Sequence, residues 1–176
     1  MAWKTRGLRG STLEEMINRT NELYKEHDLC LIQKIPTPIT PIKMNEDHTQ
    51  ITLAYFDQKS TVDYIGAVQS FPVCFDAKEC LGTTFALANI HEHQVSFMED
   101  FEKQGGISFL VIYFTSLDRF YYLRFSKLKE FWMRMLSGGR KSFRVDELED
   151  GFDLKGHDGL LVPYLDGIKK DLTLRQ

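Results

Sequence analysis

The sequence has few of the features that mark several common protein classes. Its three cysteines, Cys30, Cys74 and Cys80, form neither an even-numbered disulfide framework nor a zinc-ligand spacing, so we interpret them as reduced core thiols. No apolar run reaches membrane-spanning length, and the first six residues lack the apolar stretch of a secretory signal. The sequence also lacks a glycine-rich phosphate loop, a Ser-His-Asp arrangement, internal repeats and low-complexity segments. These absences favour a cytoplasmic protein that is not associated with a membrane.

Positive charge is also scarce overall. The chain carries 22 lysines and arginines against 25 aspartates and glutamates, which gives a net charge of −3. This balance argues against a protein that coats nucleic acid indiscriminately. The basic residues nevertheless cluster near the start and late in the chain, at Lys4, Arg6, Arg9, Arg140, Lys141 and Arg144. Local patches of this kind suit an enzyme that binds DNA along a defined path, whereas solvated charge runs are the alternative interpretation.

The hydrophobic pattern predicts a mixture of helices and strands. Apolar residues at helical spacing indicate helices over about 12–26, 90–104 and 127–137, with Ser11, Asn89 and Ser126 as the expected caps. Apolar runs indicate strands at 29–34, 51–56, 73–78, 107–115 and 120–125, of which 107–115 should be central and buried. The order of these elements predicts one α/β domain over residues 1–176 with a mixed sheet.

Residues 35–56 should project from this domain. Three prolines, Pro36, Pro38 and Pro41, exclude the segment from a central strand. A polar turn at 45–50 and a returning strand at 51–56 then complete a two-armed excursion that ends in Tyr55 and Phe56. Exposed aromatic rings on such an arm can stack on nucleobases, and the alternative is that they pack on the domain.

Two carboxylates and one lysine form the pattern that carries chemistry. Asp63 stands at the head of a short apolar segment, and Asp76-Ala77-Lys78 continues a strand-like run. Asp76 and Lys78 should share a face because side chains alternate along a strand, and a hairpin would bring Asp63 beside them. Such a trio suits phosphodiester hydrolysis: the carboxylates hold a divalent cation, and the lysine orients a water or stabilises charge on the phosphate. The alternative is a solvated strand face with an Asp–Lys pair.

The roles of Glu14 and of the two histidines His91 and His93 have more than one interpretation. Glu14 can complete a capping box with Ser11, or it can act as a third acid near the cation. His91 and His93 are two residues apart, so on a helix they should diverge and not form a metal-binding pair; we expect at most one of them near the site, and solvent exposure is the favoured outcome.

The order of several motifs resembles the RecU-type Holliday junction resolvases, which belong to the restriction-endonuclease-like nuclease superfamily. The motifs are Arg9-Gly-Ser-Thr-Leu-Glu14, Lys34-Ile-Pro-Thr-Pro38, Ala54-Tyr-Phe56, Ser60-Thr-Val-Asp63-Tyr64, Phe75-Asp-Ala-Lys-Glu79, His91-Glu-His-Gln94 and Gly139-Arg-Lys-Ser142. The resemblance implies a restriction-endonuclease-like mixed sheet flanked by helices, with a stalk projecting from a homodimer into a four-way DNA junction. It also implies a RecA-type recombinase as a candidate partner.

The resemblance also implies roles for individual residues. Asp63 and Asp76 take the metal-binding positions for Mg²⁺ or Mn²⁺, Lys78 takes the catalytic position, and Glu14 matches an acid of the first helix. The DNA-binding positions are Arg6, Arg9, Lys34, Tyr55, Phe56, Arg140 and Lys141. Asp76 stands where the family usually has Glu, and Val62 stands where it usually has Thr. The implied activity is metal-dependent cleavage of junction DNA; the alternatives are a same-fold nuclease for other DNA and a weakly catalytic or non-catalytic junction-binding, recombinase-modulating protein.

Overall fold

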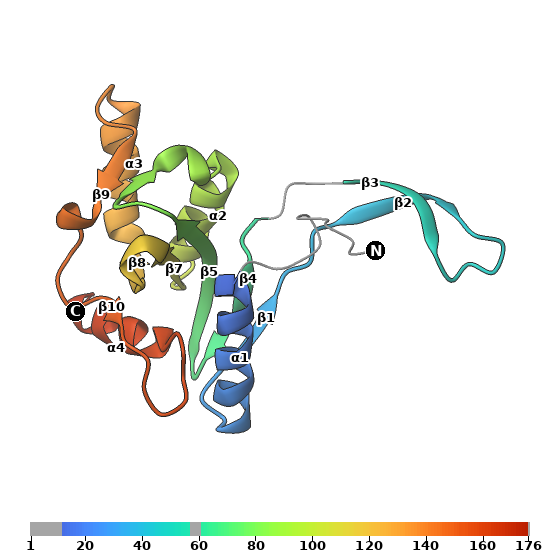
Figure 1. Cartoon of the computed structure of the whole chain (residues 1–176), viewed down its shortest axis with the longest axis horizontal. Coiled ribbons are helices and arrows are strands. Elements are labelled where there is room, and N and C mark those ends of the chain that lie inside the picture. Colours follow the sequence, from blue (N-terminus) through green and yellow to red (C-terminus); the bar gives the residue numbers. More distant parts are fainter. Residues whose placement is uncertain (1–11, 57–60, 176) are drawn as a thin grey trace.

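A six-stranded mixed sheet organises the fold (Figure 1). The computed structural model describes residues 12–56 and 61–175. The strands of the sheet lie in the order β1 (Leu31–Lys34), β4 (Tyr64–Val68), β5 (Phe71–Cys80), β7 (Ile107–Phe114), β8 (Arg119–Arg124) and β10 (Asp153–Leu154). Strands β5 and β7 run parallel, and the other neighbouring pairs are antiparallel. The predicted mixed α/β architecture is therefore confirmed.

Four helices cover the two faces of the sheet. Helices α1 (Thr12–Glu26) and α4 (Tyr164–Leu174) pack on one face, whereas α2 (Glu92–Lys103) and α3 (Phe125–Leu136) pack on the other. On the α1 face a row of stacked rings crosses four strands, with centroid distances of 4.3–4.7 Å. The rings belong to Tyr64, Phe75, Phe109 and Tyr122. All four are fully buried, so they fix the register of the strands that carry the candidate site.

The β2–β3 hairpin is the predicted projecting arm. Strands β2 (Ile39–Met44) and β3 (Ile51–Phe56) pair with each other alone and extend away from the sheet and its helices (Figure 1). The register shifts after Pro41, as expected for a residue that cannot donate to a ladder. Asn45 closes the tip, because its Oδ1 accepts the main-chain N–H groups of Thr49 and Gln50.

Several helix boundaries differ from the predictions. Helix α2 begins at Glu92 with His91 as its N-cap, whereas Asn89 ends a short 3₁₀ turn. Helix α3 begins at Phe125, so Ser126 lies inside the helix instead of capping it. A local capping contact sets the start of α2, because Gln94 Oε1 accepts the main-chain N–H of His91.

No helix or strand was predicted after residue 137, yet helix α4 completes the core. Asp171 of α4 is 1% exposed and accepts bonds from Tyr122, from Arg175 and, in an ion pair, from Arg124. Arg175 in turn pairs with Glu102 of α2. This network joins the C-terminal helix to β8 and to the end of α2.

The small third sheet was also not predicted. Strand β6 (Thr84–Ala86) pairs with β9 (Ser142–Arg144), and their rings Phe85 and Phe143 stack 5.0 Å apart. The three cysteines are buried and free, as expected. Within the described ranges 12–56 and 61–175, no helix is long and apolar enough to cross a membrane.

Candidate functional site

Asp63 and Asp76 lie opposite each other at one end of the β4–β5 hairpin. The register pairs Tyr64 with Phe75, so the next positions along the ladder are Asp63 and Asp76. The N–H of Asp63 donates to Asp76 Oδ1 over 2.9 Å, and the N–H of Ala77 donates to Asp63 Oδ2 over 3.0 Å. Each carboxylate is therefore held by the main chain of the strand that carries the other.

Two side chains hold the second oxygen of Asp76. The ammonium of Lys78 lies 2.5 Å from Asp76 Oδ2, and the amide of Gln94 in α2 donates to the same oxygen over 2.9 Å. Asp76 is fully buried, and the side chain of Lys78 is 19% exposed. The prediction that Asp76 and Lys78 share one face is confirmed, and that face is the one α2 covers. A buried carboxylate is tolerated only when it is paired and hydrogen-bonded in this way.

The two carboxylates also perturb each other electrostatically. Burial, followed by the charge of Asp76, raises the pKa of Asp63 from 3.8 to about 6. The N–H of Ala77 and the ammonium of Lys78 act in the opposite direction but do not cancel the rise. Close carboxylates whose charges repel each other are a typical setting for a divalent cation, which removes the repulsion.

Gln94 was not predicted as a site residue. Its Oε1 accepts the N–H of His91 over 3.1 Å while its amide group holds Asp76, so it joins the start of α2 to the acid pair. The sequence carries a signal for it: Gln94 lies one turn before Met98 on the buried stripe of α2 and is itself only 5% exposed. A polar residue on a buried stripe requires a polar partner.

Glu14 and Lys34 pair with each other at the base of the arm. The Nζ of Lys34 donates to Glu14 Oε2 over 2.7 Å, and Lys34 pairs with Tyr64 across β1 and β4. The side chain of Lys34 therefore lies on the face of the sheet that α1 covers. Lys34 is opposite Tyr64, the residue that follows Asp63. The predicted cap partner Ser11 lies outside the described residues. Glu79 of β5 also caps α1 at Leu13, whose N–H donates to Glu79 Oε1 over 2.8 Å.

The predicted aromatic residues of the arm are exposed. Tyr55 is 51% exposed and Phe56 is 77% exposed, at the end of β3 that leads towards Asp63. Among the alternatives left by the sequence, packing of these two rings on the domain is therefore excluded.

The late basic cluster is partly neutralised within the chain. Arg140 donates to Glu147 over 2.9 Å, and Arg144 lies 3.2 Å from Asp146. No acidic group of the described ranges forms an ion pair with Lys141, which is exposed beside β9. Arg6 and Arg9 lie outside the described residues.

The rings of His91 and His93 were predicted to diverge, but they lie against each other. They stack with centroids 5.3 Å apart and an angle of 12° between planes. The spacing argument failed because His91 is the N-cap and does not follow the helical rotation of 100° per residue.

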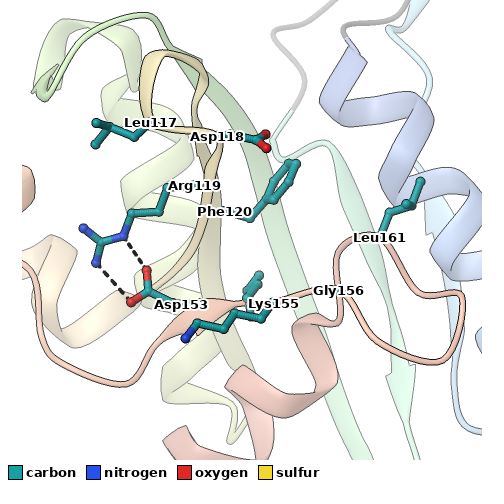
Figure 2. A pocket seen from close by; sticks show the side chains of 9 residues that line it. Leu117, Asp118, Arg119, Phe120, Asp153, Lys155, Gly156 and Leu161 are labelled. Atoms are coloured by element: carbon teal, nitrogen blue, oxygen red, sulfur yellow. Dashed lines mark hydrogen bonds and ion pairs between the residues drawn. The ribbon is translucent and has the colours of Figure 1, made fainter.

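A separate pocket of about 540 Å³ lies between β8, β10 and the loop that follows (Figure 2). Two of its charged side chains neutralise each other, because Arg119 donates to Asp153 through two nitrogens. Phe120 and Leu161 supply apolar surface. All nine lining residues lie outside the set predicted from the sequence, so this pocket is distinct from the acid pair.

The comparisons with known proteins agree with the motif order. Residues 8–170 match the family described as RecU, Recombination protein U. A Holliday junction resolvase RecU of Pediococcus pentosaceus is 40% identical over 169 residues, covering 93% of this chain and 84% of the relative. A second, from Geobacillus sp., is 42% identical over 147 residues, covering 81% of this chain and 73% of the relative.

Among solved structures, Archaeoglobus fulgidus Hjc, a Holliday junction resolvase, overlaps 66% of this chain and 78% of its own with a TM-score of 0.41 and 9% identity. That overlap adds nothing to the assignment. The family match spans almost the whole chain and the sequence relatives cover most of both partners, and on those grounds the chain belongs to the RecU family.

Proposed function

We propose that this chain is a structure-selective endonuclease that resolves four-way DNA junctions. The observation that carries the proposal is the convergence of Asp63, Asp76 and Lys78 on one end of the β4–β5 hairpin. Its relatives are named Holliday junction resolvases, which gives the substrate class. The arm with exposed Tyr55 and Phe56 starts beside the same hairpin end, where the N–H of Ile35 donates to the carbonyl of Asp63, and this supports recognition of the branch point next to the chemistry.

The residues present fit a divalent cation of the Mg²⁺ type. Asp63 and Asp76 would hold it, and the burial of Asp63 together with the charge of Asp76, which raises the pKa of Asp63, supports this. Within the described ranges 12–56 and 61–175 no group of three or more His, Cys, Asp and Glu side chains could hold a metal ion, so the pair would supply two ligands and water would supply the others. Mg²⁺ commonly uses one or two carboxylates and completes its shell with water, and Mn²⁺ accepts the same oxygen ligands.

Each residue of the trio then has a task. When bound, the cation polarises the phosphate and lowers the pKa of a water molecule. Asp63 and Asp76 would hold the cation at the end of the hairpin where the reacting phosphate has to lie. Lys78 supplies an ammonium that donates to the attacking water or to the phosphate oxygens as negative charge develops. The amide of Gln94 and the main-chain N–H of Asp63 keep Asp76 from rotating, which preserves the geometry between turnovers.

A homodimer is part of the same proposal. Resolution requires two cuts on opposite strands, and a two-fold dimer supplies two sites related by the symmetry of the junction. A RecA-type recombinase is proposed as a partner on the basis of the family's role in recombination. Size-exclusion chromatography with light scattering tests the first point, and a binding assay with a purified recombinase tests the second.

The decisive experiment compares a mobile four-way junction with a linear duplex of matched sequence. Each is incubated with the protein in Mg²⁺, Mn²⁺ or EDTA, and cleavage and binding are measured separately. We expect cleavage of the junction alone, dependence on the cation, and loss of cleavage with retained binding in Asp76→Asn. Binding without cleavage by the unmodified chain would favour the alternative of a non-catalytic junction-binding protein. Equal cleavage of both substrates would favour a nuclease for other DNA.

A further inference from the structure

The chain leaves the sheet for the arm and returns to it at neighbouring positions, and one of these positions is Asp63. Strand β1 ends at Lys34, β4 begins at Tyr64, and these two residues pair in the ladder. Ile35 and Asp63 are the next residues on the two sides, so they form the base of the whole excursion that carries the arm (Figure 1). The N–H of Ile35 donates to the carbonyl oxygen of Asp63 over 2.8 Å. One hydrogen bond therefore closes the base of the arm at a residue of the acid pair.

This bond adds to the main-chain contacts that hold Asp63. The N–H of Asp63 donates to Asp76 Oδ1, and the carboxylate of Asp63 accepts the N–H of Ala77. Both of these contacts are made with β5, whereas the carbonyl oxygen of Asp63 contacts the chain that leaves β1. Because the peptide group is planar, a fixed carbonyl also fixes the main-chain torsion that orients Asp63 between the two strands. The first residue of the arm segment thus takes part in orienting the Asp63 carboxylate.

The connection between Ile35 and the paired part of the arm is short and rich in proline. Pro36 follows Ile35 directly, and Pro38 is the residue before β2. Proline fixes its own φ and favours an extended backbone in the residue before it, so such a segment is stiff. A displacement of the arm, for example when DNA contacts its exposed rings, is therefore transmitted to Ile35 and from there to Asp63.

We propose that the main-chain N–H of Ile35 is a positioning group for Asp63 and that it joins the base of the arm to the acid pair. This inference rests on the proposed junction endonuclease function and adds a residue to it. Ile35 takes no part in the chemical step. It holds Asp63 where one cation can contact the carboxylates of both Asp63 and Asp76, and it thereby makes cleavage depend on the placement of the arm.

Three substitutions separate this bond from the effects of the side chain and of an added proline. Ile35→Pro removes the N–H, and position 35 already favours the extended conformation that proline accepts, because it precedes Pro36. Thr37→Pro is the matched control. It also adds a proline directly before a proline, yet within the described ranges no main-chain acceptor takes the N–H of Thr37. Ile35→Ala removes the side chain and keeps the N–H, and circular dichroism melting checks that each variant is folded.

We expect Ile35→Pro to lower the single-turnover cleavage rate at saturating four-way junction about tenfold, the effect of one lost hydrogen bond and a misplaced acid. The dissociation constant for the junction, measured in Ca²⁺ at one salt concentration, should stay within about twofold, and both controls should cleave within about twofold of the unmodified chain. A second measurement needs neither cation nor DNA. In EDTA, the stability that the unmodified chain loses between pH 4.5 and pH 6 should become smaller in Ile35→Pro alone, because a loosened Asp63 is less buried and lies further from Asp76.

The inference is overturned if folded Ile35→Pro matches Ile35→Ala in rate and in pH dependence, or if Thr37→Pro shows the same fall. A loss of junction affinity that accounts for the lower rate also contradicts it, because the arm and not the acid would then have moved. Should Ile35→Pro fail to fold, hydrogen exchange in the unmodified chain decides: relative to its intrinsic rate, the Ile35 amide should exchange at least about tenfold more slowly than that of Thr37, and equal rates refute the bond. Failure of the proposed function appears differently, since the unmodified chain would then not cut the junction, whereas the measurements in EDTA would still test Ile35.

Discussion

Asp63→Asn is expected to stabilise the protein at neutral pH in the absence of a divalent cation. The substitution keeps an oxygen that can accept the N–H of Ala77, so the main-chain bond at 3.0 Å is retained. It removes a carboxyl group whose pKa is about 6 in the folded chain and 3.8 as its ordinary value. Between these two pH values the folded state binds more protons at Asp63 than the unfolded state does. The free energy of unfolding therefore falls as pH rises through this window.

The size of this effect follows from the same two values. The difference between 3.8 and about 6, at about 1.4 kcal/mol per pH unit, amounts to about 3 kcal/mol that the unmodified protein loses between pH 4 and pH 7. For a chain of 176 residues, about 3 kcal/mol corresponds to a change of about 6–12 °C in melting temperature. The free energy of unfolding of Asp63→Asn should therefore fall much less between pH 4 and pH 7.

The assay is thermal or urea unfolding in EDTA at pH 4.5, 5.5, 6.5 and 7.5, for the unmodified chain and for Asp63→Asn. The two stability curves should lie closest at pH 4.5, separate mainly between pH 4.5 and pH 6, and run nearly parallel above that, with the variant more stable. Addition of Mg²⁺ at pH 7.5 should stabilise the unmodified chain and leave the variant unchanged, because the ligand is lost. A constant offset between the curves at all four pH values would refute the reasoning, since the crowding of the two carboxylates would then not be the cause.

Three further changes test other parts of the site. Lys78→Gln should lower the cleavage rate on the order of a hundredfold or more while junction affinity stays within a few-fold, measured by single-turnover cleavage and gel shift. Gln94→Ala should leave Asp76 one donor short, lowering stability by about 1–3 kcal/mol together with the cleavage rate, whereas a normal melting curve would show that another donor replaces the amide. The double change Tyr55→Ala, Phe56→Ala should weaken junction binding by about five- to a hundredfold at fixed salt, with little effect on duplex; equal losses on both substrates would contradict branch selection by the arm.

Local rules sufficed for most of the central sheet and for the trio. Asp76 and Lys78 were placed on one face by strand alternation alone, and the prolines from Pro36 to Pro41 excluded the arm from the sheet. Each of these inferences depends on residues close in sequence, where backbone geometry leaves few alternatives. The position of Asp63 needed one additional assumption, the hairpin, which the short connection between β4 and β5 satisfies.

The features that were missed depend on contacts between distant segments. Gln94 acquires its role from Asp76, 18 residues earlier, and Glu79 caps α1 at Leu13 across 66 residues. The buried position of Asp171 requires Tyr122 and Arg124, which lie 49 and 47 residues earlier in the chain. No local sequence pattern indicates such partners, because a polar residue in a helix is usually exposed to solvent. A search for polar residues on otherwise apolar stripes would have found Gln94.

The fold keeps the carboxylates of Asp63 and Asp76 close together because main-chain hydrogen bonds hold both of them. An isolated pair of carboxylates would relieve repulsion by rotating apart, at the cost of a rotamer change of order 1 kcal/mol. Here each carboxylate accepts a main-chain N–H from the opposite strand, so moving either one breaks a ladder-like contact. The stacked rings of Tyr64, Phe75 and Phe109 lie on the other face of the same strands and fix their register. The stacked rings on the α1 face of the sheet therefore keep the two carboxylates close together on the α2 face, and a cation that binds both carboxylates removes their repulsion.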